Sequence, residues 1–290
     1  MRQGRSKMTK AYLVGAGPGD PRLLTIAAAE AIQIADVILC DRLVSKEIIA
    51  LAKPHCHIVY VGKHPGEQEV VQKQIFDYFL EYADGNDVVV RLKGGDPYVF
   101  GRGSEEYIVL KQLGYDVTVI PGISSAIGVP ALAGIPVTAR GVAASFAVVT
   151  GHCCGDSNVL WHKYVHIDTL VVLMGVSERA VIAQELITAG RNPLEPIAFV
   201  ENGSSANQRV IRSTLGAVRD GLLEVSSPAV FVIGAVTRIY EEIESRVNFS
   251  SRQLVEPVLL STARSELTNK HLAEADITLC ELPRSADSAA

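Results

Sequence analysis

The chain has 290 residues, of which 48% are hydrophobic and 20% charged, which is enough to build one or two hydrophobic cores. Its formal net charge of -5 argues against a broad basic surface, so we expect neither nucleic acid nor an anionic membrane as a partner. The five cysteines are odd in number and lack CxxC spacing, which indicates neither a disulfide framework nor a zinc site and favours the cytoplasm. We find no signal-peptide pattern and no unbroken apolar run of about 20 residues, so we expect a protein that is neither exported nor embedded in a membrane.

Short runs rich in Val and Ile recur along the chain and predict a series of strands. These runs are residues 12–14, 37–40, 58–61, 88–92, 117–120, 146–149, 170–173, 197–200 and 230–233. Most are continuously apolar, as in strands that are covered on both faces of a parallel sheet. Helical patterns such as "LLTIAAAEAIQIA" and "SERAVIAQELITAG" lie between several of them. The sequence therefore predicts an α/β fold with mainly parallel sheets.

A stretch rich in Gly and Pro divides the predicted strands into two groups. It lies between residues 120 and 138, and the strand spacing starts again at Phe146. We therefore expect an N-terminal α/β lobe over residues 9–122 and a C-terminal α/β lobe over residues 123–243. A ligand cleft is expected between the two lobes. Residues 244–290 follow a polar linker and are too few to bury a core alone.

Glycine follows many of the predicted strands, as in "LVGAGPGD", "RLKGGDP" and "VTGH". Ligands of open parallel sheets bind beyond the carboxyl ends of strands, where glycine lets them approach the backbone, although tight turns favour glycine without any ligand. The first of these turns departs from the dinucleotide motif GxGxxG, because Asp20 replaces its last glycine and Pro18 has no backbone N–H. Asp41 still imitates the ribose-binding acid of that motif. A dehydrogenase or a non-catalytic ligand-binding protein thus remains an alternative.

The glycine-rich turns belong to a longer series of motifs. In order, these are "VGAGPGDP", "DRLVS", "VGKHPG", "VVRLKGGDPYVFGRGSEE", "VIPGISSAIGVPALAGIPVT", "VTGH", "LMG" and "VENGSSANQR". By these motifs the sequence resembles the tetrapyrrole methylases, which use S-adenosylmethionine, over residues 11–240. The resemblance implies a homodimer of two-lobed subunits that binds S-adenosylmethionine between its lobes, releases S-adenosylhomocysteine and needs no metal. The motifs "RLKGGDP" and "FGRGSEE" favour C-methylation of uroporphyrinogen III at two pyrrole carbons, giving precorrin-2 for sirohaem or cobalamin.

The resemblance also assigns roles to individual residues. The implied cofactor contacts are Pro18, Gly94, Gly95, Asp96, Val99, Ser124, Ser125, Met174 and Gly203. The implied catalytic base and acid are Asp41 and Lys63. The chain departs from the family at Val99, where Ile is common, and at the serine pair, where Thr-Ala is common. The C-terminal segment "PVLLSTARSELTNKHLAEADITLCELPR" faintly resembles the opening unit of uroporphyrinogen-III synthase.

The chemistry of single residues leaves several roles open. Asp41 ends a predicted strand, and Ser45 is a better cap for the next helix, which frees Asp41 to act as a base or to stabilise positive charge. It could equally pair with Arg42. Lys63 could be a surface lysine, and Met174 could be a core residue. Candidate partners for the acidic groups of the substrate, some of which we expect to make structural ion pairs instead, are Arg22, Arg42, Arg91, Lys93, Arg102 and Arg140.

Overall fold

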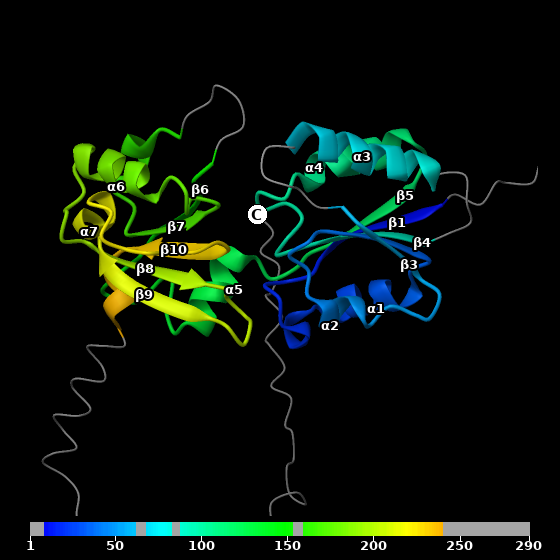
Figure 1. Ribbon diagram of the computed structural model, residues 1–290, viewed down its shortest axis with the longest axis horizontal. Helices are drawn as coiled ribbons and strands as arrows, with labels where there is room; N and C mark the ends of the chain where they lie inside the picture. Colours follow the sequence, from blue (N-terminus) through cyan, green and yellow to red (C-terminus); the bar gives the residue numbers. More distant parts are fainter. Residues whose placement is uncertain (1–8, 62–67, 83–87, 153–158, 240–290) are drawn as a thin grey trace, which may run out of the picture. The chain divides into compact units, whose positions relative to one another are not determined.

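The computed structural model describes residues 9–61, 68–82, 88–152 and 159–239. These residues form two five-stranded sheets with helices packed on them (Figure 1). Predictions that concern Lys63, Cys153, Cys154 and residues 244–290 lie outside the described residues. In the described ranges, no helix is long and apolar enough to cross a membrane.

The first sheet is parallel throughout and has the strand order β3-β2-β4-β1-β5. Its strands are β1 (Lys10–Gly15), β2 (Val37–Cys40), β3 (His57–Tyr60), β4 (Val88–Lys93) and β5 (Asp116–Ile120). The central strand β4 reads VVVRLK and is almost entirely buried, as expected for a strand covered on both faces. The carboxyl ends of all five strands therefore lie at one edge of the sheet.

Helices cover both faces of this first sheet (Figure 1). They are α1 (Ile26–Ile34) and α2 (Lys46–Ile49) on one face, and α3 (Gln68–Glu81) and α4 (Gly103–Gln112) on the other. Hydroxyl groups begin both helices of the first pair, because Thr25 accepts a hydrogen bond from Ala28 N and Ser45 accepts one from Ile48 N. The predicted capping role of Ser45 is confirmed.

The second sheet has the strand order β6-β7-β10-β8-β9. Its strands are β6 (Phe146–Thr150), β7 (Thr169–Leu173), β8 (Pro196–Glu201), β9 (Arg209–Thr214) and β10 (Ala229–Ile233). Only β6 and β7 are parallel, and the other pairings are antiparallel. The α/β class and the parallel first sheet are confirmed, whereas the mainly parallel pattern does not extend to this sheet. Residues 202–208 between β8 and β9 are too few for a parallel crossover, so the two strands must run in opposite directions.

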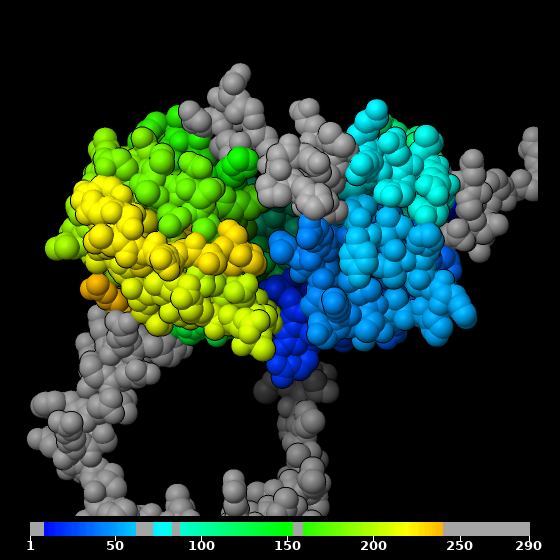
Figure 2. All heavy atoms as spheres, in the orientation of Figure 1, coloured from blue at the N-terminus to red at the C-terminus, as the bar shows by residue number. Residues whose placement is uncertain are grey.

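The sequence did not predict β9, which reads RVIRST. It is an edge strand that lies at the surface (Figure 2) and has partly exposed residues along its length. Such a strand does not show the continuous apolar run of its buried neighbours. The strands that the sequence predicted between residues 12 and 233 are all present.

The second sheet is also covered on both faces. The helix α5 (Ser125–Leu132) packs on one face, where Ala126 and Val129 join a core cluster with strand residues. The helices α6 (Arg179–Thr188) and α7 (Leu215–Arg219) pack on the other face (Figure 1). Short 3-10 helices are η1 (Pro21–Leu23), η2 (Trp161–Tyr164) and η3 (Ala235–Arg238). The helix α5 follows β5 directly in the chain, so it carries residues next to the first sheet into contact with the second.

Candidate active site

The turns after β1 and β4 are tied together by their backbones. Gly17 N donates to Gly95 O at 3.1 Å, and Gly95 N donates to Gly17 O at 2.8 Å. A Cβ atom on Gly15 would lie only 2.5 Å from Gly122 N, so the end of β5 is packed against the same place. The amides of Gly17 and Gly95 satisfy each other and are not free to bind a pyrophosphate. The structure thus gives a second reason, beside Pro18 and Asp20, why this turn is unsuited to a dinucleotide.

The pair Gly94–Gly95 forms a turn with one open side. Gly95 has φ +68°, a left-handed conformation that favours glycine. Among the atoms of the described residues, a Cβ atom on Gly94 would have one neighbour within 4 Å, Leu43 Cβ at 3.8 Å. The bare backbone at this position can therefore be approached closely by a ligand, which fits the predicted cofactor contacts.

Asp96 fixes this turn to the end of β5. One of its carboxylate oxygens accepts a hydrogen bond from Tyr98 N at 2.8 Å, and the other accepts one from Gly122 N at 3.1 Å. Val99 N donates to the backbone oxygen of Asp96 at 3.2 Å, which continues the turn. The sequence assigned Asp96 and Val99 to the cofactor, and the structure shows that Asp96 also holds the backbone in place.

The first residues of α5 face the glycine turn. A Cβ atom on Gly95 would lie 3.5 Å from both Ser125 N and Ser125 Oγ. Ser124 caps the helix with its hydroxyl group. On the other side of the helix start, a Cβ atom on Gly128 would lie 3.3 Å from Pro18 Cγ. The structure therefore brings Pro18, Gly95, Ser124 and Ser125 to one place.

The loop after β8 contacts both the turn after β1 and the helix α5. Ser204 Oγ accepts a hydrogen bond from Asp20 N at 2.8 Å. A Cβ atom on Gly203 would lie 2.4 Å from Val129 Cγ1, so Gly203 is required for packing against α5. This packing role was not predicted from the sequence, which offers only the glycine itself as a signal.

Met174 is not a core residue, which removes the alternative that the sequence left open. It is 52% exposed and has φ 57°, an uncommon conformation for a residue with a side chain. Four of the five other described residues with side chains and positive φ lie after β4 and β8, namely Phe100, Arg102, Asn202 and Ser204; the fifth, His55, precedes β3. Such strain often accompanies functional loops. No contact links Met174 directly to the glycine turn among the interactions described.

A cluster of charged side chains lies beside the same turn, at the carboxyl ends of β2 and β4. Arg91 Nη2 donates to Asp41 Oδ1 at 2.5 Å, and Arg91 Nε donates to Glu106 Oε1 at 3.1 Å. Lys93 Nζ lies 3.0 Å from Glu106 Oε1 and 3.9 Å from Asp41 Oδ2. Burial lowers the pKa of Lys93, the charge of Arg91 lowers it further, and the carboxylates of Asp41 and Glu106 oppose this shift. Asp41 therefore pairs with Arg91, a partner that the sequence did not predict for it.

The cluster shows which of the candidate cations form structural ion pairs. Arg91 and Lys93 are buried and paired with acids, so they are poor partners for the acidic groups of a substrate. The sequence did indicate that the two side chains lie together, because residues two apart on a strand point to the same face. Both also interrupt an apolar run, which is typical of charged residues on a buried strand. Nothing in the sequence pattern singled out Glu106. The neighbouring Cys40 is buried, which raises the pKa of its thiol to about 11 and makes it unsuitable as a nucleophile.

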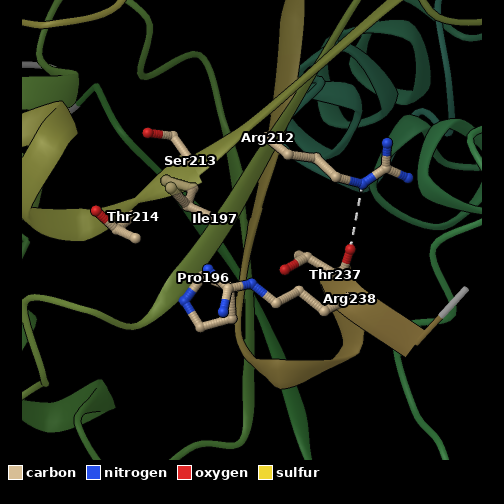
Figure 3. A pocket seen from close by; sticks show the side chains of 7 residues that line it. All are labelled: Pro196, Ile197, Arg212, Ser213, Thr214, Thr237 and Arg238. Atoms are coloured by element: carbon tan, nitrogen blue, oxygen red, sulfur yellow. Dashed lines mark hydrogen bonds between the residues drawn. The ribbon is translucent and has the colours of Figure 1, made fainter. Parts of the chain in front are cut away.

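A pocket of about 280 Å³ lies elsewhere, in the second half of the chain (Figure 3). Its lining residues are Pro196, Ile197, Arg212, Ser213, Thr214, Thr237 and Arg238. Arg212 Nε donates to Thr237 O at 3.3 Å across it (Figure 3). Pro196 begins β8, whereas Gly203 follows the other end of that strand, so this pocket is separate from the candidate site. Within the described ranges, His, Cys, Asp and Glu side chains form no group of three or more that could hold a metal ion.

The fold and the site together define a class. A parallel sheet carries an open glycine turn and a paired carboxylate at its carboxyl edge, and a second sheet supplies a helix that faces the turn. The family described as Tetrapyrrole (Corrin/Porphyrin) Methylases matches residues 10–219. The chain belongs to this family of methyltransferases, and the resemblance inferred from the motifs is confirmed.

Individual relatives are similar over most of the chain. The uroporphyrinogen-III C-methyltransferase of Methanocaldococcus jannaschii is 44% identical over 240 residues, which cover 80% of this chain and 98% of that protein. Siroheme synthase 2 of Aeromonas hydrophila is 42% identical over 83% of this chain and 52% of its own length. The crystal structure of uroporphyrin-III C-methyl transferase from Thermus thermophilus complexed with S-adenyl homocysteine matches with a TM-score of 0.71 at 43% identity, covering 79% of this chain and 94% of that one.

Proposed function

We propose that this chain transfers methyl groups from S-adenosylmethionine to two pyrrole carbons of uroporphyrinogen III, giving precorrin-2 for sirohaem or cobalamin. The observation that carries the proposal is the open turn at Gly94, whose nearest side-chain neighbour, Leu43, belongs to the loop that begins with Asp41. A surface for the methyl donor and a candidate base thus lie next to each other. The named relatives support this choice of donor and substrate.

The residues of the chain have separable roles in this proposal. Gly94 and Gly95 offer bare backbone, and Ser124 and Ser125 bring the start of α5 to the same surface. Pro18, Asp96, Val99, Met174 and Gly203 complete the proposed cofactor contacts. When bound, S-adenosylmethionine supplies a methyl group that is already activated by its positive sulfur, so positioning of the substrate is the main task of the protein.

Proton transfer is the remaining chemical task. Asp41 is 32% exposed and lies at the edge of its charged cluster, so one side of its carboxylate can face a ligand. We assign it the role of accepting the proton that the substrate loses after methylation. Lys63, which lies outside the described residues, is proposed as the acid on the basis of the family motif alone.

The test is to incubate the purified protein with uroporphyrinogen III and S-adenosylmethionine and to analyse the products by mass spectrometry. We expect a product with two added methyl groups and an equivalent amount of S-adenosylhomocysteine. A folded protein that binds a nicotinamide dinucleotide tightly, and that neither binds nor consumes S-adenosylmethionine, would support the dehydrogenase alternative instead.

We also propose that the chain works as a homodimer in the cytoplasm, with lobe boundaries near residues 122 and 243. Apolar side chains support the dimer, because Ile127 is 48% exposed and Leu132 is 45% exposed on α5, and Ile123 before it is 37% exposed. Light scattering coupled to size-exclusion chromatography should give twice the mass of the chain. A monomer that is fully active would contradict the dimer proposal.

A further inference from the structure

The charged cluster at the carboxyl ends of β2 and β4 is organised around Glu106 of α4. The side chain of Glu106 is fully buried, and its Oε1 atom accepts hydrogen bonds from both Arg91 and Lys93. Its other oxygen, Oε2, is also buried and accepts no hydrogen bond from the described residues. Of the four side chains in the cluster, Asp41 has the largest exposed fraction. Glu106 therefore reaches Asp41 only through the two cations.

The formal charges of the cluster explain what Glu106 adds. Two cations and two carboxylates sum to zero when Asp41 is ionised. Without the charge of Glu106, Arg91 and Lys93 would both act on Asp41 alone. Nearby cations favour the charged form of a carboxylate, so Asp41 would then accept a proton less readily.

We propose that Glu106 is a positioning residue that holds and neutralises Arg91 and Lys93, so that Asp41 can accept a proton from the substrate. The inference rests on the function proposed above. In this step the bond between the proton and the macrocycle breaks, its electron pair stays in the macrocycle, and a new O–H bond forms on Asp41. The cluster then carries one positive charge, which favours release of the proton to water and return to the starting state.

Among the described residues, the charged groups that face Lys93 come from three elements. Arg91 shares β4 with it, Asp41 faces it from the end of β2, and Glu106 faces it from α4. Glu105, on the same helix, also lies within electrostatic reach. Because Glu105 is 49% exposed and paired with Arg102, it provides a matched control from the same turn of helix.

The first experiment compares Glu106→Gln with Glu105→Gln. In Glu106→Gln we expect kcat to fall by about 10- to 100-fold, because the base is weakened but not removed. S-adenosylmethionine affinity, measured by calorimetry, should stay within about twofold of the wild-type value because the glycine turn is untouched. Glu105→Gln should keep the wild-type kcat. An unchanged kcat in Glu106→Gln would overturn the proposal.

A second variant separates charge from packing. Glu106→Gln combined with Lys93→Met returns the cluster to zero net charge, since Arg91 and Asp41 remain. We expect this double variant to turn over about tenfold faster than Glu106→Gln. If Glu106 acted only by packing, the second substitution would slow the enzyme further, and a double variant no faster than the single one would contradict our inference.

A measurement on the unliganded wild-type protein does not depend on the folding of any variant. The proposal requires Lys93 to be cationic at pH 7, which NMR of isotopically labelled lysine side chains can determine. A neutral Lys93 at that pH would refute the charge count. If the wild-type protein makes no methylated product, the proposed function fails; if it does, and Glu106→Gln loses nothing, only the present inference fails.

Discussion

Replacing Gly95 by Ala tests the cofactor surface with little disturbance of the protein. The new Cβ atom would lie 3.5 Å from Ser125 N and Oγ, which is an ordinary contact. The remaining cost is that of placing a side chain at φ +68°, about 1–2 kcal/mol. For a chain of this size that corresponds to a decrease of about 2–8 °C in Tm. The protein should therefore still fold.

Gly114→Ala supplies the matched control. Gly114 has φ +85°, and no atom of the described residues would lie within 4 Å of a Cβ atom at this position, so the substitution carries a similar backbone cost. It precedes β5, whereas the candidate site lies beyond the other end of that strand. Both variants should show similar losses of Tm by calorimetry, although their positions differ.

Ligand binding should then separate the two variants. We expect S-adenosylmethionine to bind Gly95→Ala at least about tenfold more weakly, a loss of about 1.4 kcal/mol, because the methyl group occupies the proposed contact surface. Gly114→Ala should bind as the wild-type protein does. Equal affinities in both variants, measured by isothermal titration calorimetry, would show that the cofactor does not contact this turn.

Three further predictions address neighbouring features. Asp41→Asn should lower kcat by about 10²- to 10⁴-fold with unchanged cofactor binding, since Arg91 keeps Glu106 as a partner; near-normal turnover would mean that Asp41 is only structural. Gly203→Ala should lower the free energy of unfolding by about 1–3 kcal/mol through overlap with Val129, and Val129→Ala should restore part of it in denaturant titrations. Removing residues 244–290 should leave kcat within about twofold, because the family match covers residues 10–219 and ends before this segment; a folded but inactive truncation would contradict this.

The sequence predicted the first sheet more completely than the second for a physical reason. Buried parallel strands such as β2 and β4 are continuous apolar runs, and the long helical connections between them leave clear periodic patterns. In the second sheet, β9 is an edge strand without a buried residue, and its direction depends on the short loop before it. A run of apolar residues indicates a strand but does not indicate which way it runs.

The site shows a similar division. The turns of the candidate site could be predicted from the motifs, because a turn or a close approach of two backbones requires glycine, as at Gly95 with φ +68°. The hydrogen bonds of these turns could be seen only in the structure, for example the two backbone hydrogen bonds between Gly17 and Gly95. Hydrogen bonds between residues about 80 positions apart leave no local pattern that a single sequence can display.

The charged cluster decides between two roles that the sequence left open for Arg91 and Lys93. From the sequence, each was either a partner for the acidic groups of the substrate or a member of a structural ion pair, since arginine and lysine serve both purposes. In the structure they lie on the covered face of a central strand, where an unpaired charge would be strongly unfavourable. Their burial is possible because Glu106 and Asp41 neutralise them from two other elements. The electrostatic environment of Asp41 is thus set by residues of β4 and α4. Its chemistry therefore cannot be assigned from its own place in the sequence.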